Sequence, residues 1–406
     1  MPLVKETAVA IDHAIPLNRT VKTLGVVSLL NDFSSEVTVR TLPLFLSNIL
    51  GVRIGIIGLI EGIAESTATL LQLFSGYLSD RIGRRKALTL CGYGLSNFIK
   101  PLLYFGTAGW GVVLAVRFLD RVGKGIRTAP RDALIADITP PEQRGKAFGF
   151  RKAMDKTGAV IGLLIGAIVL YLSQRDSLTL TLETYLWLVL LAVLPGLAAV
   201  VVLVGWVEEK SKTTTAMKPT FHWSEVGGRF WGFIGVLVLF TLGNSSDAFL
   251  MLRAQTLGLS MVEIFLAVAA FNLVISLSST KGGALSDALG RRGLIVAGWI
   301  IYASIYIGFA FASAWWHAWI LYAGYGLYYG AFQGAANALV ADLVPEHLRG
   351  TAYGIFNGAL GIAAFPASLL AGLLWDWYGP PAPFLVGGGL AVMAAIGLLM
   401  IPSKDR

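Results

Sequence analysis

Residues 76–86 read GYLSDRIGRRK, a short run in which one carboxylate and a basic cluster separate two long apolar stretches. A second copy, GALSDALGRR, stands at residues 283–292, and the two agree at seven of ten positions with an offset of 207. Two more pairs occur in the same order at nearly the same offset: ALIADITP at 133–140 matches ALVADLVP at 338–345, and SSE at 34–36 matches SSD at 245–247. These ordered matches predict a chain built from two similar halves.

The composition around these motifs is that of a membrane protein. Hydrophobic residues make up 55% of the 406 residues, charged residues only 14%, and the mean hydropathy is +0.70. A transmembrane helix needs about 20 mostly apolar residues. The sequence offers twelve such stretches, and they leave no room for a large soluble domain: 21–50, 54–79, 87–108, 110–133, 146–172, 184–206, 230–257, 262–286, 294–314, 317–341, 351–376 and 381–401.

Charge in the connecting segments predicts the orientation. Basic residues gather in alternate segments, at 81–86, 131–146, 210–218, 291–292 and 349, whereas the other segments hold Arg53, Arg175 and two nearly uncharged turns. Because cytoplasmic loops are enriched in Lys and Arg, both chain ends should be cytoplasmic. We therefore predict an all-α membrane protein with twelve transmembrane helices in two pseudo-symmetric six-helix bundles, 1–207 and 230–406, joined by a cytoplasmic linker at 208–229.

Several kinds of chemistry are not expected. The chain has one cysteine, Cys91, and four histidines that all lie in end or connecting segments. A metal site, an intramembrane histidine relay and a bound cofactor are therefore not predicted. There is no G-x-x-x-x-G-K-S/T loop for nucleotide, so direct use of ATP is not supported. The net charge of +8 comes from basic loops between spans, so membrane topology explains it better than nucleic-acid binding.

Charged side chains inside the apolar stretches are the first candidates for function, because each costs about 2.5–3.5 kcal/mol to insert at a helix centre. In the first stretch, Asp32, Glu36 and Arg40 are four residues apart on one helix face, so Glu36 can pair with Arg40. Asp32 then lacks a local cation, and burial of such a carboxylate favours its protonated form, which suits a proton carrier. A structural ion pair to another span is the alternative. Glu61 and Glu65 share a face of the second stretch.

The fourth stretch is the densest in charge. Basic residues recur every three or four positions along one side of the expected helix, with one carboxylate beside them: Arg117, Asp120, Arg121, Lys124, Arg127 and Arg131. At 1.5 Å per residue the stripe runs roughly 21 Å, too long to be hidden at a helix end. It should therefore face a water-filled cavity or carboxylates. Arg151 and Asp155 of the fifth stretch are candidate partners at similar depth.

The second half is poorer in intramembrane charge. At an offset of 205, Arg117 falls on Tyr322 and Lys124 on Tyr329, so a basic stripe corresponds to an aromatic wall. Charges needed only for folding would be expected in both halves, and the asymmetry therefore favours a functional role. The candidate residues of the second half are Asp247, Arg253, Tyr325, Tyr329, Gln333 and Asn337.

Together these features resemble the major facilitator superfamily, and the likeness covers essentially the whole chain. Residues 76–86 match the family's loop G-x-x-x-D-R-x-G-R-R-K, whereas the second copy has Ala288 and Gly293 at two basic positions. The resemblance implies that this loop holds the cytoplasmic side closed in one state, with Asp80 as the charge contact between halves. A role in topology alone is the alternative. The implied gating residues are Gly76, Asp80, Arg81, Gly83, Arg84, Arg85, Gly283, Asp287, Gly290, Arg291 and Arg292.

Two further motifs resemble the proton-coupled exporters of that family. Residues 121–125, RVGKG, are similar to its R-x-x-Q-G motif, whose arginine is linked to proton transfer, with Lys124 in place of glutamine. Gly158, Gly162 and Gly166 are similar to the glycine ladder of the drug exporters, without its proline. Close helix packing through small residues explains the ladder equally well.

We therefore expect a secondary active transporter that works by alternating access, with proton-coupled export of an amphipathic or anionic compound as the leading interpretation. The alternative is an organic-anion or phosphate exchanger or importer that binds its solute between Arg40 and Arg253. A membrane-embedded lipid-modifying enzyme is remote, since the Ser-Ser-carboxylate clusters repeat symmetrically. Membrane lipid, a small-molecule substrate and protons are the expected partners of a monomer in the cytoplasmic (inner) membrane.

Overall fold

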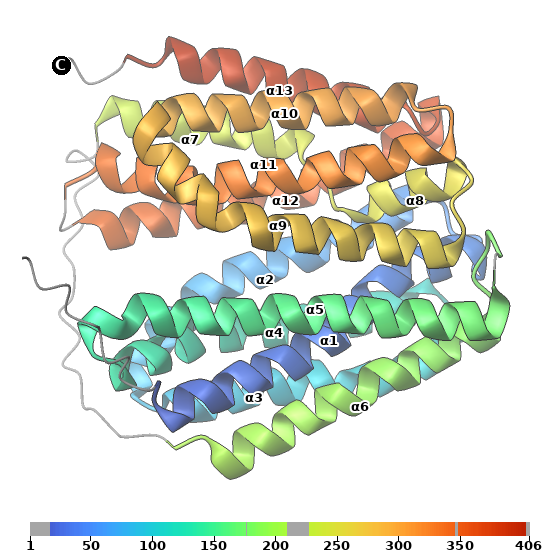
Figure 1. Cartoon of the computed structure of the whole chain (residues 1–406), viewed down its shortest axis with the longest axis horizontal. Coiled ribbons are helices and arrows are strands. Elements are labelled where there is room, and N and C mark those ends of the chain that lie inside the picture. Colours follow the sequence, from blue (N-terminus) through green and yellow to red (C-terminus); the bar gives the residue numbers. More distant parts are fainter. Residues whose placement is uncertain (1–16, 176, 209–226, 346–347, 403–406) are drawn as a thin grey trace, which may run out of the picture.

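The computed structural model describes residues 17–175, 177–208, 227–345 and 348–402 (Figure 1), apart from the side chains of Glu142, of residues 279–289 and of residues 330–334. Within these ranges every regular element is a helix. This is expected for a chain in lipid, where the backbone must satisfy its own hydrogen bonds. The linker predicted at 208–229 falls, except for its ends, outside the described residues.

The helices follow the predicted apolar stretches closely. In the first half they are α1 (Arg19–Asn48), α2 (Ile54–Ile82), α3 (Arg85–Ile99), the 3-10 helix η1 (Lys100–Ala108), α4 (Trp110–Ile138), η2 (Pro141–Gln143), α5 (Arg144–Gln174) and α6 (Leu182–Trp206). In the second half they are α7 (Gly228–Gly243), α8 (Ala248–Thr256), α9 (Met261–Leu289), α10 (Arg291–Phe311), α11 (Trp315–Leu343), α12 (Arg349–Tyr378) and α13 (Ala382–Met400).

One predicted stretch, 87–108, is interrupted in its middle. The α-helix α3 ends at Ile99, and the chain continues as the 3-10 helix η1. Pro101 has no N–H to donate to the carbonyl of Asn97, so the α-helical hydrogen-bond ladder cannot pass this point. The break places Lys100 at the junction of the two helices, well inside the apolar stretch.

A second stretch, 230–257, is interrupted as well. It forms α7 and α8, separated by Asn244–Asp247. Asn and Ser side chains compete with helical backbone bonds, and the amide of Ala248 indeed donates to the hydroxyl of Ser246 at 3.3 Å. The break exposes polar groups of residues 244–247 at the centre of the molecule.

Eight helical segments are long and apolar enough to cross a membrane: α2, α5, α6, the α7–α8 pair, Met261–Ser278 of α9, α10, α12 and α13. The helices α1 and α4 have 30 and 29 residues, but they carry the charged residues discussed below. The helix α3 has only 15 residues before its break. Twelve crossings with both ends cytoplasmic therefore stay a prediction.

The helices form two groups that Figure 1 shows one above the other. In the lower group α1 packs on α5 and α6, and α4 packs on α2 and α3. In the upper group α11 packs on α9 and α10, and α13 packs on α7 and α10. The pairs α2–α12 and α5–α9 make the main contacts between the groups.

Glycines allow the closest of these approaches. A Cβ on Gly62 of α2 would lie 2.8 Å from the carbonyl oxygen of Phe365 in α12. The glycine ladder of α5 packs in the same way, because a Cβ on Gly162 would lie 2.8 Å from the carbonyl oxygen of Phe33 in α1, and one on Gly166 would lie 2.9 Å from the Phe265 ring of α9. The ladder thus serves close helix packing here.

Candidate functional site

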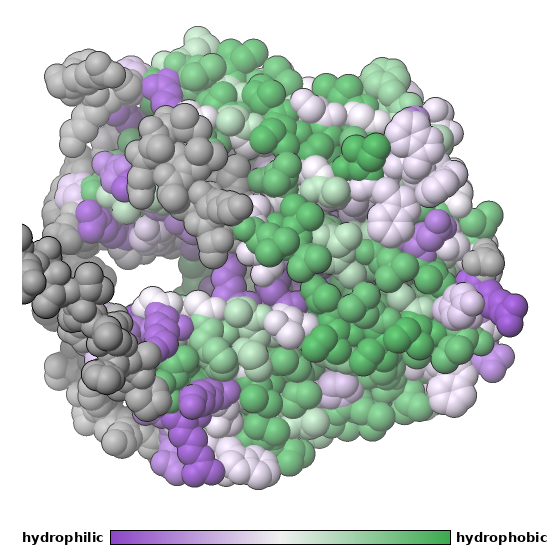
Figure 2. All heavy atoms as spheres, in the orientation of Figure 1, coloured by the Kyte–Doolittle hydropathy of each residue, from purple (hydrophilic) through white to green (hydrophobic). Residues whose placement is uncertain are grey.

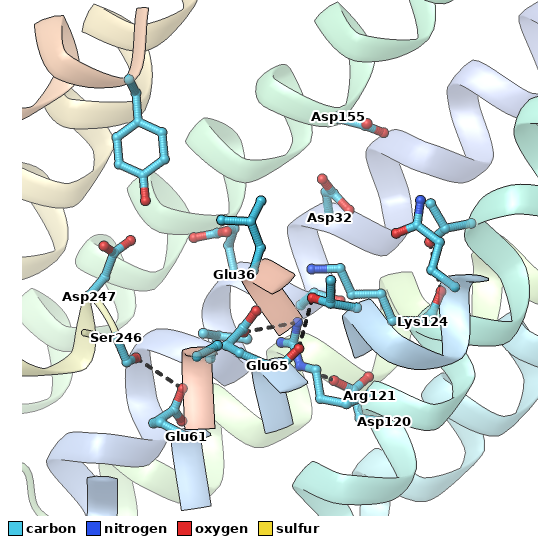
Figure 3. A pocket seen from close by; sticks show the side chains of 18 of the residues that line it. Asp32, Glu36, Glu61, Glu65, Asp120, Arg121, Lys124, Asp155, Ser246 and Asp247 are labelled. Atoms are coloured by element: carbon cyan, nitrogen blue, oxygen red, sulfur yellow. Dashed lines mark hydrogen bonds and ion pairs between the residues drawn. The ribbon is translucent and has the colours of Figure 1, made fainter. Parts of the chain in front are cut away.

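A cavity of about 820 Å³ lies between the two groups of helices. Its walls come from α1, α2, α4 and α5 on one side, and from residues 241–247, α9, α11 and α12 on the other. Figure 3 shows acidic and basic side chains from several helices around one space, among them Asp32, Glu65, Lys124 and Asp155 of the first half and Asp247 of the second. The predicted residues of the first half thus converge on a single cavity.

The deepest part of its wall is an ion pair between α2 and α4. The guanidinium of Arg117, only 1% exposed, donates to both carboxylate oxygens of Glu61, from Nη2 to Oε2 at 2.8 Å and from Nε to Oε1 at 3.2 Å. Two parallel bonds of this kind fix the geometry of both side chains. One helical turn further along α4, Arg121 lies 3.6 Å from Glu65 and 3.5 Å from Asp120. The part of the α4 stripe formed by Arg117 and Arg121 therefore faces carboxylates.

A second set of charges joins the two halves. Arg40 of α1 donates from Nε to Glu36 at 3.0 Å and from Nη1 to Asp247 of the other half at 3.3 Å. Tyr325 donates its hydroxyl to the second oxygen of Asp247 at 3.2 Å. The hydroxyl of Ser246 donates to Glu61 at 3.2 Å, as the dashed line in Figure 3 shows. The SSD motif of the second half is therefore bonded to the charged network of the first.

Several cations of the cavity have no carboxylate partner. Among the described residues, Lys124, Arg127, Lys152 and Lys156 form no ion pair. Arg127 instead bonds to the Ser96 hydroxyl and lies over the Tyr93 ring, 4.6 Å from its centroid, and Lys156 donates to the Asn272 side chain of α9 at 3.0 Å.

One carboxylate is in the opposite situation. Asp32 lines the cavity and makes no ion pair with any described cation; its side chain accepts a hydrogen bond from the Asn31 side-chain amide at 3.4 Å. The neighbouring charges of α4 and α5 are paired. Arg151 lies 2.5 Å from Asp155 and 3.6 Å from Asp132. Arg131 lies 3.0 Å from Asp132. Asp32 is therefore the carboxylate of the cavity wall that has no ion-pair partner among the described residues.

The second half lines the cavity mainly with neutral groups. Tyr329 is part of the wall, with Asn244, Asn272 and Asn357. Behind it the tyrosines are packed on one another and on Phe271, whose ring centroid is 5.1 Å from that of Tyr325. Of the tyrosines expected in this wall, Tyr329 lines the described cavity, whereas Tyr322 and Tyr325 are outside its lining and Tyr325 donates a hydrogen bond to Asp247.

Of the other residues expected in the second half, Arg253 and Asn337 are outside the lining of the described cavity. Arg253 donates to the carbonyl oxygens of Phe309 at 3.0 Å and of Ala312 at 2.8 Å, where it satisfies the end of α10, so Arg40 and Arg253 do not face each other across the cavity. Asn337 lies outside the lining, and its carbonyl accepts from Tyr353 at 2.9 Å. The side chain of Gln333 is outside the described residues.

The residues of the two repeated loops lie at the end of the molecule where α1 begins. Gly83 and Gly290 have φ of 68° and 78°, the left-handed region that favours glycine, and they let the chain turn into α3 and α10. Each following helix begins with an arginine that pairs with an aspartate in the last turn of the neighbouring helix: Arg85 with Asp137 at 2.8 Å, and Arg291 with Asp342. The two halves thus stabilise these corners alike.

The gate expected at Asp80 has a different partner in this state. Its carboxylate lies 3.3 Å from Arg85 of its own half, and no contact across the halves is seen for it in the described part of the chain. A Cβ added to Gly76 would lie 3.4 Å from the Cβ of Ala129. Arg292 donates to the Leu399 carbonyl. Arg81 is exposed, Arg84 is the residue before α3, and the side chains at 283 and 287 lie outside the described set.

The opposite end of the molecule is closed by contacts between the halves. Gln255 of α8 donates to the Asn48 side chain at 2.6 Å and to the Leu178 carbonyl at 2.8 Å. The amides of Ile54 and Gly55 donate to Asp376 of α12 at 3.0 and 2.8 Å. Figure 2 shows the molecule hollowed between the two groups at the end where α1 begins. The cavity is therefore closed at one end and approached from the other.

Lys100 is the residue of this region that sequence reasoning missed. It lies inside the apolar stretch 87–108, and its charge at that depth was the signal that could have identified it. Its neighbours Asn31 and Asn97 are also buried. None of the three is part of the cavity lining. Lys100 donates to Ser35, which does line the cavity.

A helical membrane protein with a polar cavity between two repeated groups of helices, closed at one end and hollow at the other, has the construction of a membrane transporter. The chain belongs to the major facilitator superfamily, whose family model matches residues 24–277 and 232–406.

Known proteins agree with this assignment. An uncharacterized MFS-type transporter of Methanocaldococcus jannaschii is 33% identical over 392 residues, which are 95% of each chain. The multidrug resistance protein MdtH of Photorhabdus laumondii is 31% identical over 115 residues, 28% of each chain. The crystal structure of the nucleoside transporter NupG has the same fold, with a TM-score of 0.78 at 12% identity over 94% of this chain and 99% of that one. The family resemblance read from the sequence is confirmed.

Proposed function

We propose that the protein is a secondary active transporter of the cytoplasmic (inner) membrane that exports a small amphipathic or anionic compound in exchange for protons, acting as a monomer. In this proposal the two halves, 1–207 and 230–406, are six-helix bundles joined by the linker at 208–229, with both chain ends in the cytoplasm. They rock about the central cavity so that it opens to one side of the membrane at a time.

The imbalance of charge partners in the cavity carries this proposal. Lys124, Lys152 and Lys156 form no ion pair in the described structure, whereas the arginines Arg117 and Arg121 are already held by carboxylates. A solute with an anionic group can therefore gain charge-assisted hydrogen bonds from the lysines without breaking an existing pair. Tyr329 and Phe271 offer an aromatic surface opposite them, which suits the apolar part of an amphipathic solute.

Asp32 supports the coupling to protons. It lines the same cavity as the three lysines that form no ion pair, and it makes no ion pair itself. It can therefore take up a proton from cavity water without leaving a cation unpaired. The other carboxylates proposed for the proton pathway, Glu36, Glu61, Glu65 and Asp155, each have an arginine partner. A proton on any of those would break an ion pair, and for Glu61, whose pair with Arg117 is buried, this is costly. The similarity to MdtH, named a multidrug resistance protein, supports export as the direction.

The alternative, an organic-anion or phosphate exchanger or importer built on Arg40 and Arg253, has weaker support. Arg40 is held between Glu36 and Asp247, and Arg253 is bonded to backbone carbonyls. Arg253 is outside the cavity lining, and an anion at Arg40 would compete with these two carboxylates.

A binding screen followed by a flux assay tests the proposal. The purified protein is heated with organic anions (benzoate, citrate), glycerol phosphate, ethidium and divalent metal ions, and the melting temperature is recorded. We expect stabilisation by anions and a loss of it in Lys124→Met. The best anion is then followed in proteoliposomes with and without a pH gradient. Stabilisation by ethidium and metals alone, or flux that ignores the gradient, would contradict the proposal.

A further inference from the structure

Lys100 is a buried cation held entirely by neutral oxygens. Its side chain is 1% exposed. The ammonium donates to the Ser34 hydroxyl at 2.7 Å, to the Asn97 side-chain oxygen at 3.0 Å and to the Ser35 hydroxyl at 3.2 Å. These three bonds use its full donor capacity. No carboxylate of the described chain is within ion-pair distance, although a buried charge without a partner is expensive.

The local sequence places the ammonium at this point. Pro101 ends α3, so that Lys100 begins the 3-10 helix η1 and turns toward α1. The helix α6 passes close to the same oxygens through Gly196, since a Cβ there would lie 2.8 Å from the Ser34 hydroxyl and would also meet Asn97. The break in the third stretch and the glycine of the sixth together make room for the cluster.

A hydrogen-bonded path leads from Lys100 to the cavity. Asn97 donates to Asn31 at 3.1 Å, and Asn31 in turn donates to Asp32 at 3.4 Å and to Ser35 at 3.5 Å. Ser35 and Asp32 both line the cavity. The ammonium is therefore connected to Asp32 through two neutral side chains, Asn97 and Asn31.

The charges around this path are few and identifiable. Lys100 interacts electrostatically with Asp32 from α1 and with Asp120, Arg121 and Arg127 from α4. The one charged residue of α6 is Glu183, in its first turn. Asp32 interacts electrostatically with Glu36 from α1, with Lys124 and Arg127 from α4, and with Asp155 from α5. Removal of Lys100 takes away one positive charge behind Asp32 and leaves those in the cavity in place.

We propose that Lys100 is a positioning residue for proton exchange at Asp32. The ammonium orders Ser35 directly and Asn31 through Asn97. Its field and this ordered path favour the ionised form of Asp32, so that the proton taken from cavity water is released again to water when the cavity opens to the other side. The inference rests on the proposed role of Asp32 as proton carrier and adds a reason why that proton leaves.

Infrared spectroscopy of the protein in nanodiscs tests this without any solute. The carboxylic-acid C=O band is followed as the pH is lowered, and Asp32→Asn identifies the part that belongs to Asp32. In Lys100→Met we expect the midpoint of this band to rise by about one pH unit, a tenfold change in proton affinity. Lys100→Arg should return it most of the way. Lys22→Met, the same substitution at the exposed start of α1, is the control and should leave the midpoint unchanged.

A second variant covers the case in which Lys100→Met does not fold. Gly196→Ala pushes on Ser34 and Asn97 without removing a charge, and it should shift the midpoint in the same direction by a smaller amount. An unchanged midpoint in a folded Lys100→Met protein, or in Gly196→Ala if only that variant folds, overturns the proposal. If Asp32→Asn removes no band at all, it is the role of Asp32 that fails, and the two failures are thereby separate.

Discussion

The two halves of this protein share one scaffold but differ in what they place at its centre. The first half contributes ion pairs, such as Arg117 with Glu61 and Arg121 with Glu65. The second half contributes aromatic rings, with the ring centroids of Phe271 and Tyr329 5.5 Å apart. At the helix ends the halves are alike, since both have a glycine turn followed by an arginine paired with an aspartate. The likeness serves the fold, and the difference marks where function is expected.

From this difference we expect the two halves to have different roles in transport. In the proposed proton-coupled transport, the charged wall contains the group that changes charge and the aromatic wall does not. The two walls are connected at the cavity by three described contacts, Arg40 with Asp247, Ser246 with Glu61 and Lys156 with Asn272. A change in the charged wall can therefore reach the aromatic one through a small number of hydrogen bonds.

The largest expected effect comes from breaking the charged half at its deepest point. Arg117→Ala leaves Glu61 buried without its partner, and removal of one member of a buried pair costs about 3–5 kcal/mol. We expect a strongly lowered melting temperature in detergent. The double variant Arg117→Leu with Glu61→Leu should recover much of it, and a double variant no better than the single one would show that the pair is not the source of the loss.

The next effect concerns binding. Lys124→Met removes a cation that has no ion pair in the described structure, and hydrogen bonds to charged groups contribute about 1.5–3 kcal/mol. The KM for the anion found in the screen should therefore rise about ten- to hundredfold, with little change in melting temperature. Tyr329→Phe on the opposite wall is the matched comparison and should change KM by less than about threefold. Equal effects on the two walls would remove the distinction drawn between them.

A smaller effect is expected at Arg253, and it separates the two candidate functions. Arg253→Gln weakens the bonds to the last carbonyls of α10 and should lower stability by about 1–2 kcal/mol. Because this guanidinium does not line the cavity, KM should stay the same. An increase in KM comparable to that of Lys124→Met would favour the exchanger in which Arg40 and Arg253 bind the solute.

The smallest effect is expected in the aromatic half. The Tyr322 hydroxyl is buried and has no hydrogen-bond partner in the described structure. Tyr322→Phe removes a polar atom that gains nothing from burial, so the melting temperature should stay the same or rise slightly. A clear loss of stability or transport would show that this hydroxyl has a partner during the transport cycle.

Much of the fold was predictable from the sequence, because it depends on composition and on local pattern. The apolar stretches, the repeat at residues 76–86 and 283–292 and the pair of Glu36 with Arg40 follow from hydropathy, sequence identity and helical spacing. The breaks in 87–108 and 230–257 were missed, although Pro101 and the polar run Asn244–Asp247 were there to indicate them. An apolar average hides such short interruptions.

The candidate site was predicted only in part, because contacts between distant helices have no local signature. Nothing in the spacing tells that Arg40 reaches Asp247, 207 residues away, or that Arg253 turns to the end of α10. The stripe of α4 was found because it repeats along one helix face. Lys100 was missed because it stands alone in an apolar stretch, and its partners Ser34, Ser35 and Asn97 are polar residues that composition alone does not single out.

One measurement tests the central claim, that the charged half couples transport to protons through Asp32. Export of the anion identified in the screen is followed in proteoliposomes while the pH gradient is varied, for the wild-type protein and for Asp32→Asn. We expect the wild-type rate to follow the gradient, and Asp32→Asn to keep exchange of anion for anion while its net flux no longer responds to the gradient. An Asp32→Asn protein whose flux still follows the gradient as the wild type does would contradict the account.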